Sequence, residues 1–187
     1  MLIYEIPGRE NIEVQNIVFD YNGTIAVDGK LINGVEELIN KLAEYAKIYI
    51  LTADTYGTVE KECVRINGKI LTFPKDNAGD SKKEIVRSIK GNTICLGNGY
   101  NDIPMFKEAI LSIAIIEREG ASGELLSKAD IVVKSIIDAL NILLNKNMVK
   151  ATLRSWNPYN GKGIINKKIT INLKLILICS LYNIWFK

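Results

Sequence analysis

The stretch Asn16–Thr24, NIVFDYNGT, decides the fold of this chain. It begins with an apolar run that leads into Asp20, and the turn-forming pair Asn22–Gly23 follows directly. Such a run predicts a buried strand, because strands covered on both faces are apolar along their whole length. The carboxylate of Asp20 is therefore expected at the end of that strand, where the chain turns.

Short apolar runs alternate with helical patterns from this strand onward, which is typical of βαβ units. We therefore predict an α/β fold, a doubly wound, mainly parallel Rossmann-like sheet with helices on both faces. We expect Asn33 to cap the first helix, and Asp80 or Ser81 to cap the third. The predicted strands are Asn16–Asp20, Lys47–Thr52, Thr93–Leu96, Leu111–Ile116 and Asp130–Val133, and the predicted helices are Gly34–Ala46, Thr55–Val64, Asp80–Lys90, Ile103–Ala109 and Ser135–Asn145.

Two dipeptides that favour tight turns, Asp28–Gly29 and Asn67–Gly68, each lie between short strand-like segments. We predict a β-hairpin at both. The first hairpin would form a small flap over the Asp20 loop, and the segments between the strands are too short for a large cap domain. The active site is therefore expected to be open, or to be covered by a neighbouring subunit in a homo-oligomer.

The composition excludes several kinds of chemistry. The chain has 187 residues, no histidine and three cysteines that lie far apart, so catalytic triads that use histidine are excluded and a zinc site is not expected. The net charge of +3 is small, and we expect no nucleic-acid partner. The N-terminal stretch lacks the apolar core of a signal peptide, which favours a cytoplasmic location. No GxGxxG follows the first strand, so a dinucleotide-binding oxidoreductase is disfavoured.

Polar residues follow three of the predicted strands, where open α/β sheets bind their ligands. A carboxylate such as Asp20 can attack phosphorus and form an aspartyl-phosphate, whereas the plainer interpretation is a turn-capping aspartate. Gly23 lets the loop turn so that its amides face phosphate oxygens, and Thr24 can support that loop. The hydroxyl of Thr52 could hold a phosphate oxygen, or belong to an ordinary strand end.

Two further elements fit a phosphate and a metal ion. Either Lys82 or Lys83 could neutralise phosphate charge, although a surface lysine is the plainer interpretation. Oxygen ligands from Asn98 and Asp102, in the glycine-rich GNGYND segment, suit Mg²⁺. The alternative for this segment is a simple turn, with Asp102 as a helix cap.

These four elements, in this order, resemble the haloacid dehalogenase superfamily, and most of all the phosphorylation domain of P-type ATPases and the soluble proteins similar to it. The matching segments are DYNGT, Thr52, KKEIV at 82–86 and GNGYNDIPMF at 97–106, within a resemblance that covers roughly residues 14–145. The resemblance implies a Mg²⁺-dependent hydrolase, either a phosphatase or ATPase-like, that acts on a phosphorylated small molecule or a phosphoprotein. It also favours Lys82 over Lys83.

The resemblance implies a role for each residue. Asp20 is the nucleophile and a metal ligand, and Asn22 offers its carbonyl as a second ligand. The metal site is expected to be completed by Asn98 and Asp102. The residues expected to bind the phosphoryl group are Gly23, Thr24, Thr52, Lys82 and Asn101, and those expected to take part in catalysis are Asp20, Asn22, Thr52 and Lys82.

Two positions depart from the pattern of the superfamily. Its phosphatases usually carry an aspartate, the general acid and base, where this chain has Asn22. Its metal site usually has an aspartate where this chain has Asn98. These departures predict slow turnover, and they leave open a non-catalytic module that binds phosphate or a partner. The resemblance to the phosphorylation domain, together with the apolar C-terminal stretch, leaves open a further alternative, a regulatory partner of a membrane transporter.

Residues 1–150 are expected to form the phosphoryl-transfer domain, and residues 151–187 a basic and apolar C-terminal extension. The stretch Ile169–Phe186 is strongly apolar with one lysine. Three interpretations stay open for the extension: a segment that packs on the domain, a poorly ordered or non-native extension, and a membrane anchor.

Overall fold

The computed structural model of the protein describes residues 1–8, 10–54 and 58–154. At its centre lies a six-stranded sheet in which every neighbouring pair of strands is parallel. The predicted α/β fold with a mainly parallel sheet is therefore confirmed. In spatial order the strands are β10 (Ile131–Val133), β9 (Leu111–Ile115), β8 (Thr93–Gly97), β3 (Asn16–Asp20), β6 (Lys47–Thr52) and β7 (Lys69–Thr72).

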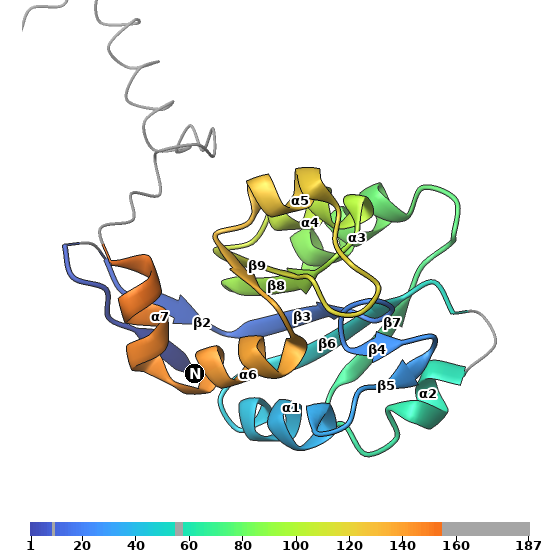
Figure 1. Ribbon diagram of the computed structural model, residues 1–187, viewed down its shortest axis with the longest axis horizontal. Coiled ribbons are helices and arrows are strands. Elements are labelled where there is room, and N and C mark those ends of the chain that lie inside the picture. The colour runs from blue at the N-terminus through green and yellow to red at the C-terminus, as the bar shows by residue number, and fades with distance from the viewer. Residues whose placement is uncertain (9, 55–57, 155–187) are drawn as a thin grey trace, which may run out of the picture. The chain divides into compact units, whose positions relative to one another are not determined.

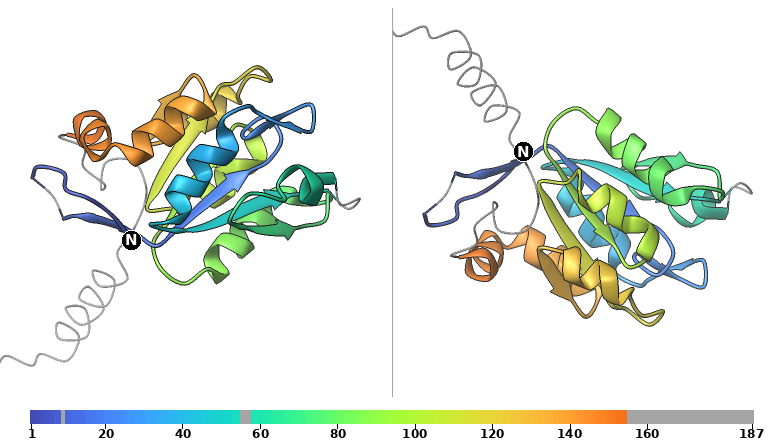
Figure 2. Two further views of the ribbon diagram at one scale, coloured as in Figure 1. Left: turned by 90° about the horizontal axis from the view of Figure 1, so that it is seen from below. Right: turned by 90° about the horizontal axis from the view of Figure 1, so that it is seen from above.

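Helices cover both faces of the sheet (Figures 1 and 2). On one face α1 (Val35–Ala43) contacts α6 (Ile136–Leu144), and on the other α3 (Ala78–Ser88) contacts α4 (Ile103–Phe106). The helix α5 (Gly123–Lys128) lies beside α4. A 3-10 turn, η1 (Tyr100–Asp102), leads directly into α4. The helix α2 (Thr58–Glu62) lies near the hairpin of β4 (Ala26–Val27) and β5 (Lys30–Leu31) (Figure 1).

The central strands are buried on both sides because their residues are apolar on both sides. Every residue of β3, β8 and β9 is buried. Val18 and Cys95 point into a core with Phe73 and Phe106, whereas the buried face of α1 fills the opposite side. These strands thus hold the polar residues at their carboxyl ends in fixed positions.

The first predicted hairpin is confirmed. It consists of β4 (Ala26–Val27) and β5 (Lys30–Leu31), which pair antiparallel. Both turn residues, Asp28 and Gly29, have positive φ, as a type I′ turn requires.

The second predicted hairpin is wrong. The segment Lys69–Thr72 instead pairs in parallel with β6 and forms the edge strand β7, while a turn after α2 precedes it. Gly68 permits this approach, because a Cβ there would lie 2.9 Å from the Ile48 side chain. Parallel pairing with the edge of β6 is thus favoured over the hairpin that Asn67–Gly68 would form locally.

The expected helix caps are also wrong. The N-cap of α1 is Gly34 rather than Asn33, and that of α3 is Asn77 rather than Asp80 or Ser81; both caps have positive φ and make no side-chain cap hydrogen bond. Glycine and asparagine are residue types that adopt the left-handed conformation readily, so the pattern of side-chain caps did not predict either position. The sequence did not predict α5, α7 (Lys146–Leu153), or the small antiparallel sheet of β1 (Leu2–Tyr4) and β2 (Ile12–Val14).

The predictions for the extension fall, from residue 155 on, outside the described residues. Across residues 1–8, 10–54 and 58–154, no helix combines the length and the apolar character that crossing a membrane requires.

Candidate active site

Parallel pairing brings three predicted site residues to one edge of the sheet. Asp20 ends β3, Thr52 ends the neighbouring β6, and Asn98 directly follows β8 on the other side of β3. Asp20 and Thr52 are both buried. The site therefore lies at the carboxyl ends of the central strands, where parallel α/β sheets bind ligands.

The loop after Asp20 is a compact turn built around one carbonyl. The Tyr21 carbonyl oxygen accepts hydrogen bonds from the amides of Thr24, Ile25 and Ala26, at 3.0–3.3 Å. Gly23 has a φ of 75°, and a Cβ at this position would collide with the Asn98 amide. Glycine is thus required both for the turn and for the close approach of the loop to the segment after β8.

Lys82 is the centre of a buried ion cluster. Its Nζ donates to Asp20 Oδ1 at 2.6 Å and to Asp102 Oδ1 at 2.6 Å, and it lies 3.5 Å from Asn101 Oδ1. The Phe73 ring lies 5.6 Å from the same ammonium group. Lys82 is 1% exposed, whereas Lys83 is only half-buried. Of the two candidate lysines, Lys82 is therefore the one that lies beside Asp20.

Asp102 holds the glycine-rich segment in place. Its Oδ2 accepts hydrogen bonds from the amides of Asn98 and Gly99, at 3.0 and 2.9 Å, while its Oδ1 faces Lys82. A Cβ on Gly97 would collide with this carboxylate. Both oxygens are thus already engaged, so Asp102 positions Lys82 and the loop in this structure, and its coordination of a metal ion stays a prediction.

Three oxygen atoms lie close together between Asp20 and Asn98, and only the hydroxyl of Thr24 among them carries a hydrogen. The Thr24 hydroxyl lies 3.4 Å from Asp20 Oδ2 and 3.4 Å from Asn98 Oδ1, and its single hydrogen cannot serve both acceptors at once. The side-chain nitrogen Nδ2 of Asn98 donates to the Gly120 carbonyl at 3.0 Å, so the side-chain oxygen Oδ1 is directed to Thr24. Such an excess of acceptors suits a cation.

The residues present fit Mg²⁺ better than a metal that needs several acidic or histidine ligands. In the described part of the chain, no group of three His, Cys, Asp or Glu side chains could hold a metal ion. Mg²⁺ commonly uses one or two carboxylates and keeps several waters. Asp20, Asp102 and Lys82 together carry a net charge of −1, which a divalent cation would offset.

The electrostatics make Asp20 an unusual carboxyl group. Burial raises its pKa to about 7, and the neighbouring Asp102 adds to this effect, whereas Lys82 opposes it. Burial disfavours the charged form of Lys82, but Asp102 and Asp20 outweigh it, so the pKa of Lys82 lies above its ordinary value. Once Asp20 is ionised, the site thus holds one more negative charge than Lys82 alone can neutralise.

We expect Asp20→Asn to stabilise the metal-free protein. The amide oxygen can still accept from Lys82, while the poorly compensated buried charge is lost, so the gain should be about 1 kcal/mol or more, or roughly 2–4 °C in melting temperature. Because folding raises the pKa of Asp20, its penalty grows as the pH rises from about 4 towards 7. Thermal unfolding in EDTA should therefore show the largest gain above pH 7 and little gain near pH 4. An equal gain at both pH values would contradict this charge assignment.

Lys82→Met should be strongly destabilising, because it leaves Asp20 and Asp102 buried without their shared counter-charge. Losing one partner of a buried ion pair costs about 3–5 kcal/mol. The matched control is Lys83→Met, which should change the free energy of unfolding by no more than about 0.5 kcal/mol. Denaturant unfolding of the two variants compares them directly, and equal effects would contradict the central role of Lys82.

Thr52 and Asn22 lie on either side of Asp20 in different environments. The Thr52 hydroxyl oxygen accepts from the Asp54 amide at 3.1 Å, which fixes its position at the end of β6. Asn22, in contrast, is exposed. Its side chain is therefore accessible to a substrate that approaches the loop.

The sequence did not reveal how the β4–β5 flap is held. The Asp28 amide donates to Glu119 at 2.9 Å, the Leu31 amide donates to Glu62 at 3.2 Å, and the Tyr21 hydroxyl donates to the Gly29 carbonyl at 2.9 Å. Glu119 and Glu62 come from distant segments and carry no local signal for this task. The flap is thus tied to the end of α2, to the loop that follows β9 and to Tyr21 of the Asp20 loop.

Comparison with known proteins places this site in a family. Residues 3–109 match the family model of haloacid dehalogenase-like hydrolases. The chain belongs to this family.

Individual relatives agree with that assignment. The chain is 29% identical over 130 residues to the soluble P-type ATPase-like phosphatase of Methanocaldococcus jannaschii, a match covering 65% of this chain and 47% of that protein. It is 51% identical over 61 residues to an uncharacterized protein of the same organism, covering 33% of this chain and 66% of that protein. The matches therefore span less than two thirds of the length of either relative.

A solved structure shares the fold. The 3-deoxy-D-manno-octulosonate 8-phosphate phosphatase of Moraxella catarrhalis, in complex with magnesium, phosphate and KDO, superimposes with a TM-score of 0.60 at 10% identity. The match covers 77% of this chain and 94% of that chain. This likeness shows the shared fold, and the family model over residues 3–109 confirms the predicted membership of the haloacid dehalogenase superfamily.

Proposed function

We propose that the protein is a Mg²⁺-dependent phosphohydrolase that works through an aspartyl-phosphate on Asp20. One observation carries the proposal: a buried strand-end carboxylate lies 2.6 Å from a buried lysine, beside a glycine turn and an oxygen cluster. The phosphatase named among the relatives supports the same class of reaction.

In the first step, an oxygen of Asp20 attacks phosphorus, and the bond from phosphorus to the leaving oxygen breaks. In the second step, water attacks the aspartyl-phosphate, releases inorganic phosphate and restores the carboxylate. Lys82 orients Asp20 and offsets charge on the phosphoryl oxygens, and Thr52 and Asn101 offer a hydroxyl and an amide to those oxygens. Mg²⁺, held by Asp20, the Asn22 carbonyl and Asn98, would supply further charge neutralisation.

Asn22 limits both steps. An amide cannot give a proton to the leaving oxygen, nor take one from the attacking water. Leaving groups that need no proton, such as phenolates, should therefore react better than alkoxides. The aspartyl-phosphate should accumulate, because its hydrolysis lacks a general base.

The substrate class we propose is a phosphorylated small molecule, with a phosphoprotein as the alternative. Among the described residues, only the small β4–β5 flap lies beside Asp20, and no large cap domain is present. A neighbouring subunit of a homo-oligomer could cover the site instead. A cytoplasmic location belongs to the same proposal.

The test is phosphate release from a panel of aryl, acyl and sugar phosphates, measured with Mg²⁺ and with EDTA. We expect Mg²⁺-dependent release that is fastest for the aryl and acyl phosphates. A panel on which Mg²⁺ has no effect would favour the second candidate, a non-catalytic phosphate-binding module. One observation motivates this candidate: the bond from Asn98 to the Gly120 carbonyl gives the neutral amide a structural role that a carboxylate could not fill.

A further inference from the structure

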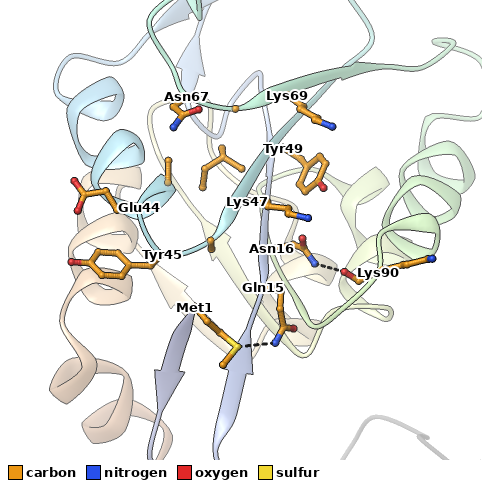
Figure 3. Close-up of a pocket in the computed structure, with 14 residues that line it drawn as sticks. Met1, Gln15, Asn16, Glu44, Tyr45, Lys47, Tyr49, Asn67, Lys69 and Lys90 are labelled. Carbon is orange, nitrogen blue, oxygen red and sulfur yellow. Dashed lines mark hydrogen bonds between the residues drawn. The ribbon is translucent and has the colours of Figure 1, made fainter.

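A hollow with polar and apolar lining residues lies at the opposite edge of the sheet from Asp20 (Figure 3). It has a volume of about 670 Å³ and is lined by the first residues of three strands, Asn16 of β3, Lys47 of β6 and Lys69 of β7. Asn16 and Asp20 are the first and last residues of β3, so roughly 13 Å of extended chain separates the hollow from the active site. None of the residues that line the hollow belongs to the candidate active site around Asp20.

Positive charge gathers on one side of this hollow. Lys47, Tyr49 and Lys69 project towards the same side of β6, and the parallel register pairs Tyr49 with Lys69 (Figure 3). Lys90, after α3, also lines the hollow, but its carbonyl oxygen faces Asn16 and its ammonium group points away from Lys47 and Lys69 (Figure 3). The one acidic lining residue, Glu44, lies on the other side of the hollow with Tyr45 (Figure 3).

None of the three lysines has an ion-pair partner among the described residues. In this respect they differ from Lys41, which pairs with Glu37. The unpaired ammonium groups of Lys47 and Lys69 on one side of the hollow create a positive potential that attracts an anion with more than one charge.

The floor of the hollow is fixed by hydrogen bonds. The buried Asn16 amide donates to the Lys90 carbonyl at 3.0 Å, and Gln15 Oε1 accepts from the Asn92 amide at 2.6 Å. The Lys47 amide donates to the Gln15 carbonyl at 2.9 Å. The backbones that carry Lys47 and Lys90 are thus joined through the start of β3, so the backbone that lines the hollow is fixed.

We propose that this hollow is a second, non-catalytic binding site for a small phosphorylated metabolite that carries at least two negative charges. Its volume falls in the range of small-molecule sites. The ammonium groups of Lys47 and Lys69 bind the phosphate groups, and the Tyr49 hydroxyl between them donates a further hydrogen bond.

The test uses the full chain, labelled with ¹⁵N and kept in EDTA, with inorganic tripolyphosphate as the probe. We expect amide resonances of residues 15–16, 47–49, 67–69 and 90–92 to shift during the titration. The double variant Lys47→Gln/Lys69→Gln should weaken binding by about tenfold or more, and added salt should weaken binding to the native chain.

The matched control is Lys61→Gln/Lys128→Gln, which removes two exposed lysines far from the hollow. It should leave the affinity within about twofold, because only distant, screened charge is lost. Shifts confined to residues around Asp20, or equal weakening in both double variants, would overturn the proposal. Titration with ADP in parallel separates recognition of phosphate alone from recognition of a whole nucleotide, and tighter binding of ADP would support a nucleotide-sized ligand.

Discussion

Asp20→Asn is expected to abolish phosphate release from an aryl phosphate, with a loss of roughly 10³-fold or more. The variant loses the nucleophile itself, and a missing nucleophile typically costs at least this much. The measurement is steady-state phosphate release at saturating Mg²⁺. The same change should stabilise the fold, so lost activity cannot be attributed to unfolding.

Lys83→Gln serves as the control for this result, because Lys83 is adjacent to Lys82 in sequence but is not part of the buried cluster. Its activity should stay within about twofold of the native chain. Turnover that survives in Asp20→Asn would show that another group attacks phosphorus, and it would refute the proposed chemistry.

Asn22→Asp should accelerate turnover by about 10²-fold or more. A carboxyl group at this exposed position would protonate the leaving oxygen and later activate the attacking water, and general acid–base help of this kind contributes about 10²–10⁴-fold. The gain should be larger for alkyl phosphates than for aryl phosphates, since alkoxides depend more on a proton. Rates for a pair of such substrates provide the measurement.

The control for the second variant is Asn22→Ser, which changes the side chain but adds no acid. It should show no gain. If Asn22→Asp and Asn22→Ser behave alike, proton transfer is not what limits the native site, and the explanation for slow turnover fails.

Stability and chemistry oppose each other at this site. The buried Asp20 carboxylate is costly because Asp102 lies close and one lysine serves both. Such a cost persists in a native protein when function requires the charge. Mg²⁺ should therefore stabilise the native chain against heat and leave Asp20→Asn almost unchanged.

Much of the sheet could be predicted because its signal is local. Buried parallel strands are apolar along their length, so Asn16–Asp20 and Lys47–Thr52 were predicted with the bounds that the structure shows. The candidate site followed from the same logic, since polar residues at strand ends must meet at one edge. The hairpin at Asn67–Gly68 was wrong because the vacant edge of β6 is a tertiary feature that no local pattern reports.

The remaining features of the site depend on contacts between distant segments. Sequence spacing alone could not separate Lys82 from Lys83, whereas burial against Phe73 separates them in the structure. Likewise, the contacts from Glu119 and Glu62 to the flap, and from Asn98 to Gly120, join segments that lie far apart in the sequence. Polar residues in loops carry no periodic pattern, so their partners become visible only in the folded chain.

The most direct test of the central claim is to trap the covalent intermediate. The full chain would be mixed with Mg²⁺ and acetyl phosphate, quenched in acid and digested, and its peptides examined by mass spectrometry. The proposed chemistry predicts a phosphate on the peptide that contains Asp20, lost upon treatment with hydroxylamine and absent from Asp20→Asn. Mg²⁺-dependent turnover in a chain that never carries phosphate on Asp20 would contradict it.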